Sequence, residues 1–374
     1  MRFFTILTTL LLFSPFFHEL QAQGCVAIRG MSGCGGSMGG SINLTQGEFM
    51  ALTGARYFKS FRHFRGHEQE TNRIEEGTQV INHSAFLDLS LSYGITDRLY
   101  ANVVLPLVYN TRSSMYEHGG NPPNGLGERH STSSQGLGDM RLSVGYWLFD
   151  HEKVHNFNYA LGLGVKLPTG KYDYMDTFYN QGPDRSETRE AVVDQSIQPG
   201  DGGTGITLDL QGFHSISPSF TLTTTLYYLF NWQETNGVLT RNGRSEFSVA
   251  DQYAARIGLF YNPAIQGFSA YLGGRIEGIP AKDIIGGDAG YRRPGYAISV
   301  EPGVSYNKNH LSVNFTLPVA LIRNRTQSYE DKERSISSGM TVHGDAAFAD
   351  YLVNLTVAYR FGGNHKVKDI IIND

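Results

Sequence analysis

The sequence predicts an all-β fold, a transmembrane antiparallel up-and-down β-barrel of about 12 strands, within a range of about 10 to 14. Three observations support this prediction. Apolar and polar residues alternate with a period of two from about residue 50 to Phe361. The connectors between the alternating segments are short and long in turn, and aromatic residues stand near the segment ends.

Residues 1–22 are expected to be a secretory signal peptide. A charged N-terminus precedes an apolar run from Phe3 to Phe17, and a short polar stretch leads to a cleavage position after Ala22 or Gln23. The run is about 15 residues long, shorter than the roughly 18 to 20 that a membrane-spanning helix needs. We therefore expect an exported protein of a Gram-negative bacterium whose signal peptide is removed.

Residues 23–48 form a glycine-rich segment that is unsuited to a strand. It is interpreted either as a flexible periplasmic leader or as a plug that folds into the barrel mouth. Both cysteines of the chain, Cys25 and Cys34, lie here, and in an oxidising compartment a disulfide between them is expected. The alternative is lipidation of Cys25, although Ala22 and Gln23 fit the required motif poorly.

The composition agrees with a barrel and excludes a nucleic-acid partner. The chain contains 44 Gly, 22 Phe and 21 Tyr in 374 residues, and its mean hydropathy is −0.27. A near-neutral average arises because apolar lipid-facing residues alternate with polar lumen residues. A net charge of −4 provides no global positive field that would attract nucleic acid.

The barrel is expected to span residues 49–361, followed by a polar periplasmic tail at 362–374. Weaker strand candidates lie near 50–64, 204–216, 266–278 and 295–307. The clearest segments carry apolar faces that run from Leu87 to Tyr93, Leu99 to Tyr109, Met140 to Leu148, Phe157 to Leu167, Phe220 to Trp232, Tyr253 to Tyr261, Leu311 to Leu321 and Tyr351 to Phe361.

Connector lengths separate a membrane barrel from a soluble β-sandwich or lipocalin-like barrel, which also alternates. Short connectors, expected in the periplasm, and long ones, expected outside the cell, follow each other strictly. The short ones lie at 94–97, 150–155, 216–219, 262–265 and 307–309, and the long ones near 65–81, 110–136, 169–203, 233–248, 279–294 and 324–349.

Charged residues on the polar parity are expected to line the lumen, because a charge facing lipid at mid-depth costs about 2–4 kcal/mol. Their mixed signs indicate either structural ion pairs that brace the lumen or a selectivity lining. These candidates are Asp88, Arg98, Asp139, Arg141, Lys166, Asp209, Arg256, Arg275, Glu277, Glu301 and Arg360.

Four motifs resemble a known family in order and spacing, over roughly residues 80–300. They are Ser92–Leu99 (SYGITDRL), Leu105–Leu107 (LPL), Gly136–Leu142 (GLGDMRL) and Lys166–Gly170 (KLPTG). The chain resembles the outer-membrane barrel family named for the meta pathway of phenol degradation, which is distantly similar to fatty-acid transporter barrels. The resemblance implies a channel or transporter for small hydrophobic or aromatic solutes, and by analogy favours the plug interpretation of the N-terminal segment.

The sequence predicts no catalytic residues, no bound metal and no cofactor. The Gly-x-Ser-x-Gly match at Gly35–Gly39 lies in the glycine-rich segment and not at a turn from a strand into a helix, and the 12 histidines are scattered. A lipid-modifying enzyme is therefore disfavoured. The alternative to transport is a structural or interaction barrel, or a subunit of a larger outer-membrane complex. Expected partners are outer-membrane lipid, a small hydrophobic solute, the barrel-assembly machinery and, in the alternative function, other outer-membrane proteins.

Overall fold

The computed structural model describes residues 43–363. The predicted signal peptide, both cysteines and nearly all of the polar tail lie outside the described residues, as does most of the glycine-rich segment. The predictions made for them, including the disulfide, the lipidation and the plug, remain predictions.

The described residues form a closed 12-strand antiparallel barrel, which confirms the predicted fold class. The first strand pairs with the last, from Phe49↔Phe361 to Phe64↔Ala346, and this pairing closes the sheet. The wall strands are β1 (Glu48–Arg65), β3 (Ile81–Gly94), β4 (Leu99–Ser114), β5 (His130–Leu137) with β6 (Arg141–Trp147), β7 (Phe157–Lys166), β10 (Gly205–Ser217), β11 (Phe220–Asn231), β14 (Gln252–Tyr261), β15 (Phe268–Ile279), β16 (Gly295–Lys308), β17 (Leu311–Thr316) with β18 (Val319–Arg325), and β19 (Ala346–Gly362).

Two wall strands are interrupted, which the alternation did not predict. Strands β5 and β6 both pair with β4, and the break between them lies at residues 138–140. A Cβ at Gly138 would lie 3.1 Å from the Pro106 ring, so this close approach favours glycine. Strands β17 and β18 separate at Pro318, which lacks the amide proton that a continuous ladder uses.

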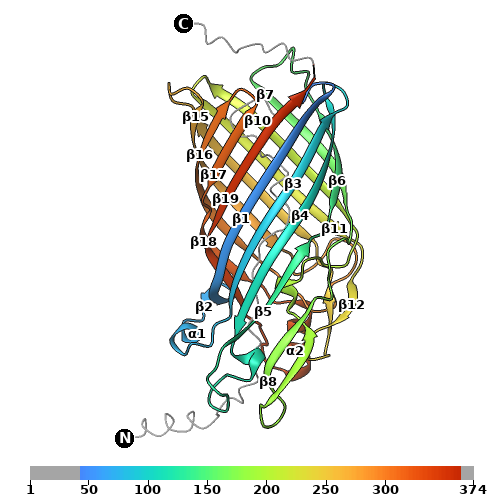
Figure 1. Ribbon diagram of the computed structural model, residues 1–374, viewed down its shortest axis with the longest axis vertical. Helices are drawn as coiled ribbons and strands as arrows, with labels where there is room; N and C mark the ends of the chain where they lie inside the picture. Colours follow the sequence, from blue (N-terminus) through green and yellow to red (C-terminus); the bar gives the residue numbers. More distant parts are fainter. Residues whose placement is uncertain (1–42, 364–374) are drawn as a thin grey trace, which may run out of the picture.

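The remaining elements gather at one end of the barrel, which we call the loop end, while tight turns occupy the opposite turn end (Figure 1). Strand β4 continues to Ser114 and β5 begins at His130, so the connector predicted at 110–136 is shorter than expected. The loop-end elements are β2 (Glu68–Gln69), α1 (Asn72–Glu75), η1 (Tyr116–His118), β8 (Met175–Gln181), β9 (Glu187–Val192), η2 (Gln195–Ile197), β12 (Thr235–Leu239), β13 (Glu246–Ser248) and α2 (Tyr329–Ser338).

Helix α2 is a further element that the alternation missed, because a helix in a connector leaves no period-two signal. The Ser328 side chain accepts a hydrogen bond from the backbone of Asp331, whose carboxylate accepts one from the backbone of Ser328. Gly339, with φ of 68°, ends the helix. Within residues 43–363, no helix is long and apolar enough to cross a membrane.

The outer face of the barrel carries a band of exposed apolar side chains, as the parity predicts. Aromatic rings pack against each other along its turn-end edge, with ring centroids 4.7 Å apart for Phe49 and Tyr93 and 4.8 Å apart for Phe268 and Tyr306. Such a belt marks a membrane interface. The exposed band includes Leu89, Leu91, Leu142, Val144, Leu161, Leu163, Ile206, Leu208, Leu226, Ile257, Leu272, Val304, Phe315 and Leu355.

Candidate solute site in the lumen

A layer of ion pairs lies on the lumen side of three neighbouring strands, β14, β15 and β16. Arg256 Nε lies 2.8 Å from Glu301 Oε2, and the Thr316 hydroxyl donates a 2.8 Å hydrogen bond to the same carboxylate. Arg275 Nη2 donates to Glu277 at 2.7 Å. All four charged groups are buried or nearly so. Pairing offsets the desolvation that an isolated charge would suffer in this wall-enclosed space.

A second set of charges lies on the opposite wall. Arg141 approaches Asp88 at 3.8 Å, and Lys166 forms an ion pair with Asp201. Asp139 lies at the break between β5 and β6, where its carboxylate accepts hydrogen bonds from the backbone amides of Gly170 and Asp201. Asp139 therefore ties two irregular segments to the barrel wall.

Three of the predicted lumen residues lie away from these sets. Asp209 faces the lumen against Gly162, where an added Cβ would lie 2.4 Å from its carboxylate. Arg360 lies near the turn end, 3.6 Å from Glu48. Arg98 differs from the prediction, because it precedes β4 at the turn-end rim, contacts backbone carbonyls of Trp147 and Leu148, and lies over the outward Tyr146 ring.

The segment from Asp194 to Asp201, which we call the inner segment, folds into the loop end of the barrel. The Asp194 side chain caps η2 by accepting from the Ser196 amide. The carbonyl of Ile197 accepts hydrogen bonds from Ser134 and Asn110 of the barrel wall, and Ile197 itself is fully buried. On the other side, Gln195 donates to the Ser248 carbonyl at 2.9 Å. The inner segment thus bridges the barrel wall and the β12–β13 hairpin of the loop end.

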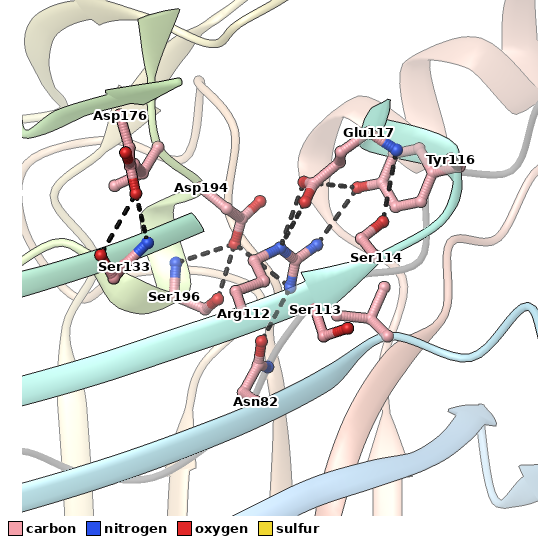
Figure 2. Close-up of polar contacts among 12 residues, drawn as sticks. Asn82, Arg112, Ser113, Ser114, Tyr116, Glu117, Ser133, Asp176, Asp194 and Ser196 are labelled. Carbon is pink, nitrogen blue, oxygen red and sulfur yellow. Dashed lines mark hydrogen bonds and ion pairs between the residues drawn. The ribbon is translucent and has the colours of Figure 1, made fainter. Parts of the chain in front are cut away.

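A buried cluster around Arg112 of β4 secures the inner segment (Figure 2). Arg112 contacts Glu117 at 3.1 Å, Asn82 at 3.3 Å and Asp194 at 3.8 Å. Arg293 also forms an ion pair with Asp194. Burial would raise the pKa of Asp194, but the guanidinium groups of Arg112 and Arg293 outweigh that effect and hold it well below its usual range. Asp194 is therefore a stable anion between two cations.

A cavity of about 120 Å³ lies beneath the inner segment. One wall combines aromatic rings with Arg56, Asp88, Asp139, Arg141 and Lys166, and the opposite wall comes from β11, β13, β14 and the segment before β16. Its apolar lining consists of Phe58, Phe86, Pro106, Tyr227, Leu229, Phe247, Ala250 and Ile279. Its remaining lining comes from Gly138, Gln195, Ser196, Gln198, Pro199, Gly200, Asp201, Asn236, Ser248, Gln252, Arg292 and Arg293.

The cavity combines residues that the sequence analysis named with others that it missed. Asp88, Asp139, Arg141 and Lys166 line it, whereas the other named candidates do not. The aromatic lining and the inner segment were missed, because irregular segments carry no periodic signal and because inward rings on a strand resemble ordinary core residues. Among residues 43–363, no group of three or more His, Cys, Asp or Glu side chains is arranged to hold a metal ion.

Comparisons with known proteins place the fold and the family. Among solved structures, an outer membrane channel from Pseudomonas putida F1 is similar over 87% of this chain and 100% of its own, with 12% identity and a TM-score of 0.57. The toluene transporters TodX of P. putida and TbuX of Ralstonia pickettii align over 86% and 92% of this chain and 91% and 99% of their own, with 11% and 12% identity and TM-scores of 0.39. No curated protein matches the chain.

Residues 68–321 match the family described as "Putative MetA-pathway of phenol degradation". This range contains the four motifs through which the sequence resembles that family. Since the match covers well over half of the chain, the protein belongs to this family.

Proposed function

We propose that the protein is an outer-membrane channel for small hydrophobic or aromatic solutes. The loop end faces the cell exterior and the turn end faces the periplasm, in line with the usual distribution of long and short connectors. The observation that carries the proposal is the cavity of about 120 Å³ with aromatic lining beneath the inner segment. Enclosed sites with mostly apolar walls and a few polar groups are typical of small-molecule binding.

The inner segment is the element that controls entry in this proposal. It lies between the cavity and the loop end, and Phe247 lines both this cavity and a smaller one of about 30 Å³ beside Asp194, Arg241 and Tyr291. A solute arriving from outside therefore meets the smaller cavity first, and displacement of Phe247 or of the inner segment connects the two.

A specific observation favours a second candidate, a closed barrel with a structural role. The ion pairs Arg256–Glu301 and Arg275–Glu277 lie buried along one wall of the lumen, and Arg256 lies over the buried Tyr271 ring. A layer of this kind braces a barrel whether or not solutes pass. The two functions differ in one measurable respect. Filling the cavity lowers solute uptake if the barrel is a channel, and leaves uptake unchanged if the barrel is closed and structural.

The test is uptake of radiolabelled toluene by intact Gram-negative cells that express the protein, because their lipopolysaccharide leaflet resists apolar solutes. Ala250, buried in the cavity wall, is replaced by Phe. We expect expression of the native chain to raise uptake and Ala250→Phe to lower it roughly 10-fold or more, since the added ring occupies the cavity.

The matched control is Ala264→Phe, which adds the same ring at an exposed turn-end position and should leave uptake unchanged. Heat-modifiable migration of each variant on a denaturing gel verifies that the barrel has formed. Uptake equal to that of cells lacking the protein, with native and variant barrels folded, would contradict transport and favour the structural role.

A further inference from the structure

We propose that a groove on the outer face of the barrel binds an acyl chain of lipid A, the phosphorylated glycolipid of the outer leaflet, and that Lys59 contacts its phosphate. The groove crosses four neighbouring strands, β19, β1, β3 and β4, and has a volume of about 370 Å³ (Figure 1). It lies on the lipid-facing side of the wall, so the inference goes beyond the proposed function and uses only the orientation given there. Three features support it: the shape of the groove, its depth in the membrane, and the charge at its loop-end edge.

Small side chains form the floor of the groove, and larger ones form its edges. Ala85 of β3 lies between Tyr57 of β1 and Tyr109 of β4 in one row across the strands. The two tyrosines are 41% and 52% exposed, so their rings stand out from the wall. Ala55 continues the floor one row nearer the turn end. The other outward residues that line the groove are Leu87, Leu107, Val353 and Leu355.

The width of the groove suits one extended chain. Tyr57 and Tyr109 stand two strand spacings apart, roughly 10 Å at the backbone. A helix with its side chains is itself about 10–12 Å across, and the wall of a second barrel is broader still, so neither reaches the floor. The Tyr57 hydroxyl and His83 Nδ1 share a 2.7 Å hydrogen bond, which holds one edge in place. A preformed edge lowers the cost of ordering on binding.

The groove lies in the half of the membrane nearer the loop end. The turn-end aromatic belt includes Phe49, which pairs with Tyr93. From Phe49 to Tyr57, β1 rises roughly 20 Å along the barrel axis, at ~3.4 Å per residue and a strand tilt of about 35–45°. The apolar band of an outer-membrane barrel is about 25 Å tall. The groove therefore faces the acyl chains of the outer leaflet.

A positive charge lies at the loop-end edge of the groove. Lys59 follows Tyr57 on the same face of β1, is exposed, and pairs with His83 of β3. Its Nζ lies 4.9 Å from the ring centroid of Phe61, further towards the loop end, so the ammonium group is directed towards the headgroups. Lys59 takes part in none of the ion pairs formed among residues 43–363. A lipid phosphate above the groove supplies the missing counter-charge.

The test of the groove is native mass spectrometry of the purified full-length chain, titrated in detergent with diphosphoryl lipid A. Ala85→Leu fills the floor, and we expect it to weaken binding roughly 10-fold, the effect of displacing about two methylene groups. The matched control is Ala51→Leu, an outward position nearer the turn end of β1, which should bind as the native chain does. Both changes place leucine on a lipid-facing surface, and heat-modifiable migration verifies that each barrel has formed.

The phosphate contact is tested with Lys59→Gln. The native chain should bind diphosphoryl lipid A more tightly than monophosphoryl lipid A. We expect Lys59→Gln to weaken binding of the diphosphoryl form roughly 5-fold and to remove this preference. Lys308→Gln, at the turn end of β16, removes a lysine far from the groove and should preserve the preference.

Three results would overturn the inference. Equal binding of lipid A by the native chain and Ala85→Leu, or an equal loss in Ala51→Leu, would mean that lipid surrounds the barrel without a defined site. Phosphatidylglycerol bound as tightly as lipid A would mean that the groove accepts any anionic lipid. A lipid-free dimer that Ala85→Leu abolishes would assign the groove to a second copy of the chain. None of these results depends on solute uptake, so the channel function is tested separately.

Discussion

The two halves of the lumen differ in how they satisfy their polar groups. The loop-end half contains buried ion pairs, aromatic rings and the inner segment, as in Arg112–Asp194 and Arg256–Glu301. The turn-end half is lined mostly by uncharged hydroxyl and amide groups, such as Ser92, Asn102 and Gln211. Both halves share the same alternating wall, so the difference lies in the inward residues and in the inner segment.

This difference indicates a division of tasks along the barrel. Buried ion pairs demand defined geometry, because a charge that loses its partner is costly, and they therefore hold one arrangement of the loop end. Uncharged groups tolerate rearrangement and rehydration at lower cost. We interpret the loop-end half as the part that recognises a solute and the turn-end half as a polar passage.

The largest expected effect on stability comes from removing the Glu301 carboxylate from the layer of ion pairs on β14, β15 and β16. Glu301→Gln keeps the size of the side chain and an acceptor for Thr316, but leaves Arg256 buried without its counter-charge. We expect a loss of about 3–5 kcal/mol in the free energy of unfolding. Urea unfolding in lipid vesicles, followed by the fluorescence of the chain's 2 tryptophans, measures it.

Its control removes both charges. Arg256→Met combined with Glu301→Leu leaves no isolated ion, so most of the loss should be recovered. A single variant as stable as the native chain would show that this layer is hydrated, and the contrast between the two halves would then disappear.

The alternation in the sequence predicted the wall but only part of the site. The inward direction of Asp88 and the outward direction of Leu89 follow from the period of two, because a strand turns alternate side chains to opposite faces. The inner segment follows no period, and its place depends on contacts between Asp194 and residues about 80 to 100 positions away, such as Arg112 and Arg293. Such long-range pairing leaves no local signal.

The broken strands illustrate the same limit. Pro318 lies within an otherwise regular alternation from Leu311 to Leu321, and the missing amide proton divides the strand into β17 and β18. The proline could have indicated the break. The break beside Asp139 could not be predicted in this way, since it depends on the backbone amides of Gly170 and Asp201 from distant loops.

An effect of intermediate size is expected in the pH dependence of stability, and it is confined to the loop end. His118 is fully buried against Phe178, with ring centroids 5.4 Å apart, and its Nδ1 accepts from the Tyr179 amide at 3.0 Å. Burial, followed by the positive charges of His130 and Arg241, lowers the pKa of His118 from 6.5 to about 4. The unfolded segment therefore binds more protons between these two values than the folded one does.

The stability contributed by neutral His118 is thus complete above about pH 6.5 and is lost as the pH falls towards 4. We expect hydrogen-exchange protection of β8 and β9, corrected for intrinsic rates, to fall roughly 10-fold between pH 7 and pH 4.5. His118→Gln, which does not titrate, should remove this dependence, and His155→Gln at the turn end should preserve it. Equal pH dependence in the native chain and His118→Gln would assign the effect to other groups.

The smallest expected effect lies in the turn-end half. The Asn102 side-chain oxygen accepts from Ser90 at 2.7 Å and from Ser92 at 3.0 Å, and Asn102→Ala removes both hydrogen bonds. The two hydroxyls can rotate towards each other or towards water, so we expect a loss of only about 0.5–1.5 kcal/mol in the same urea experiment. A loss as large as that of Glu301→Gln would mean that the turn-end half is as rigidly specified as the loop end. The uncharged lining would then be a packed core instead of a passage.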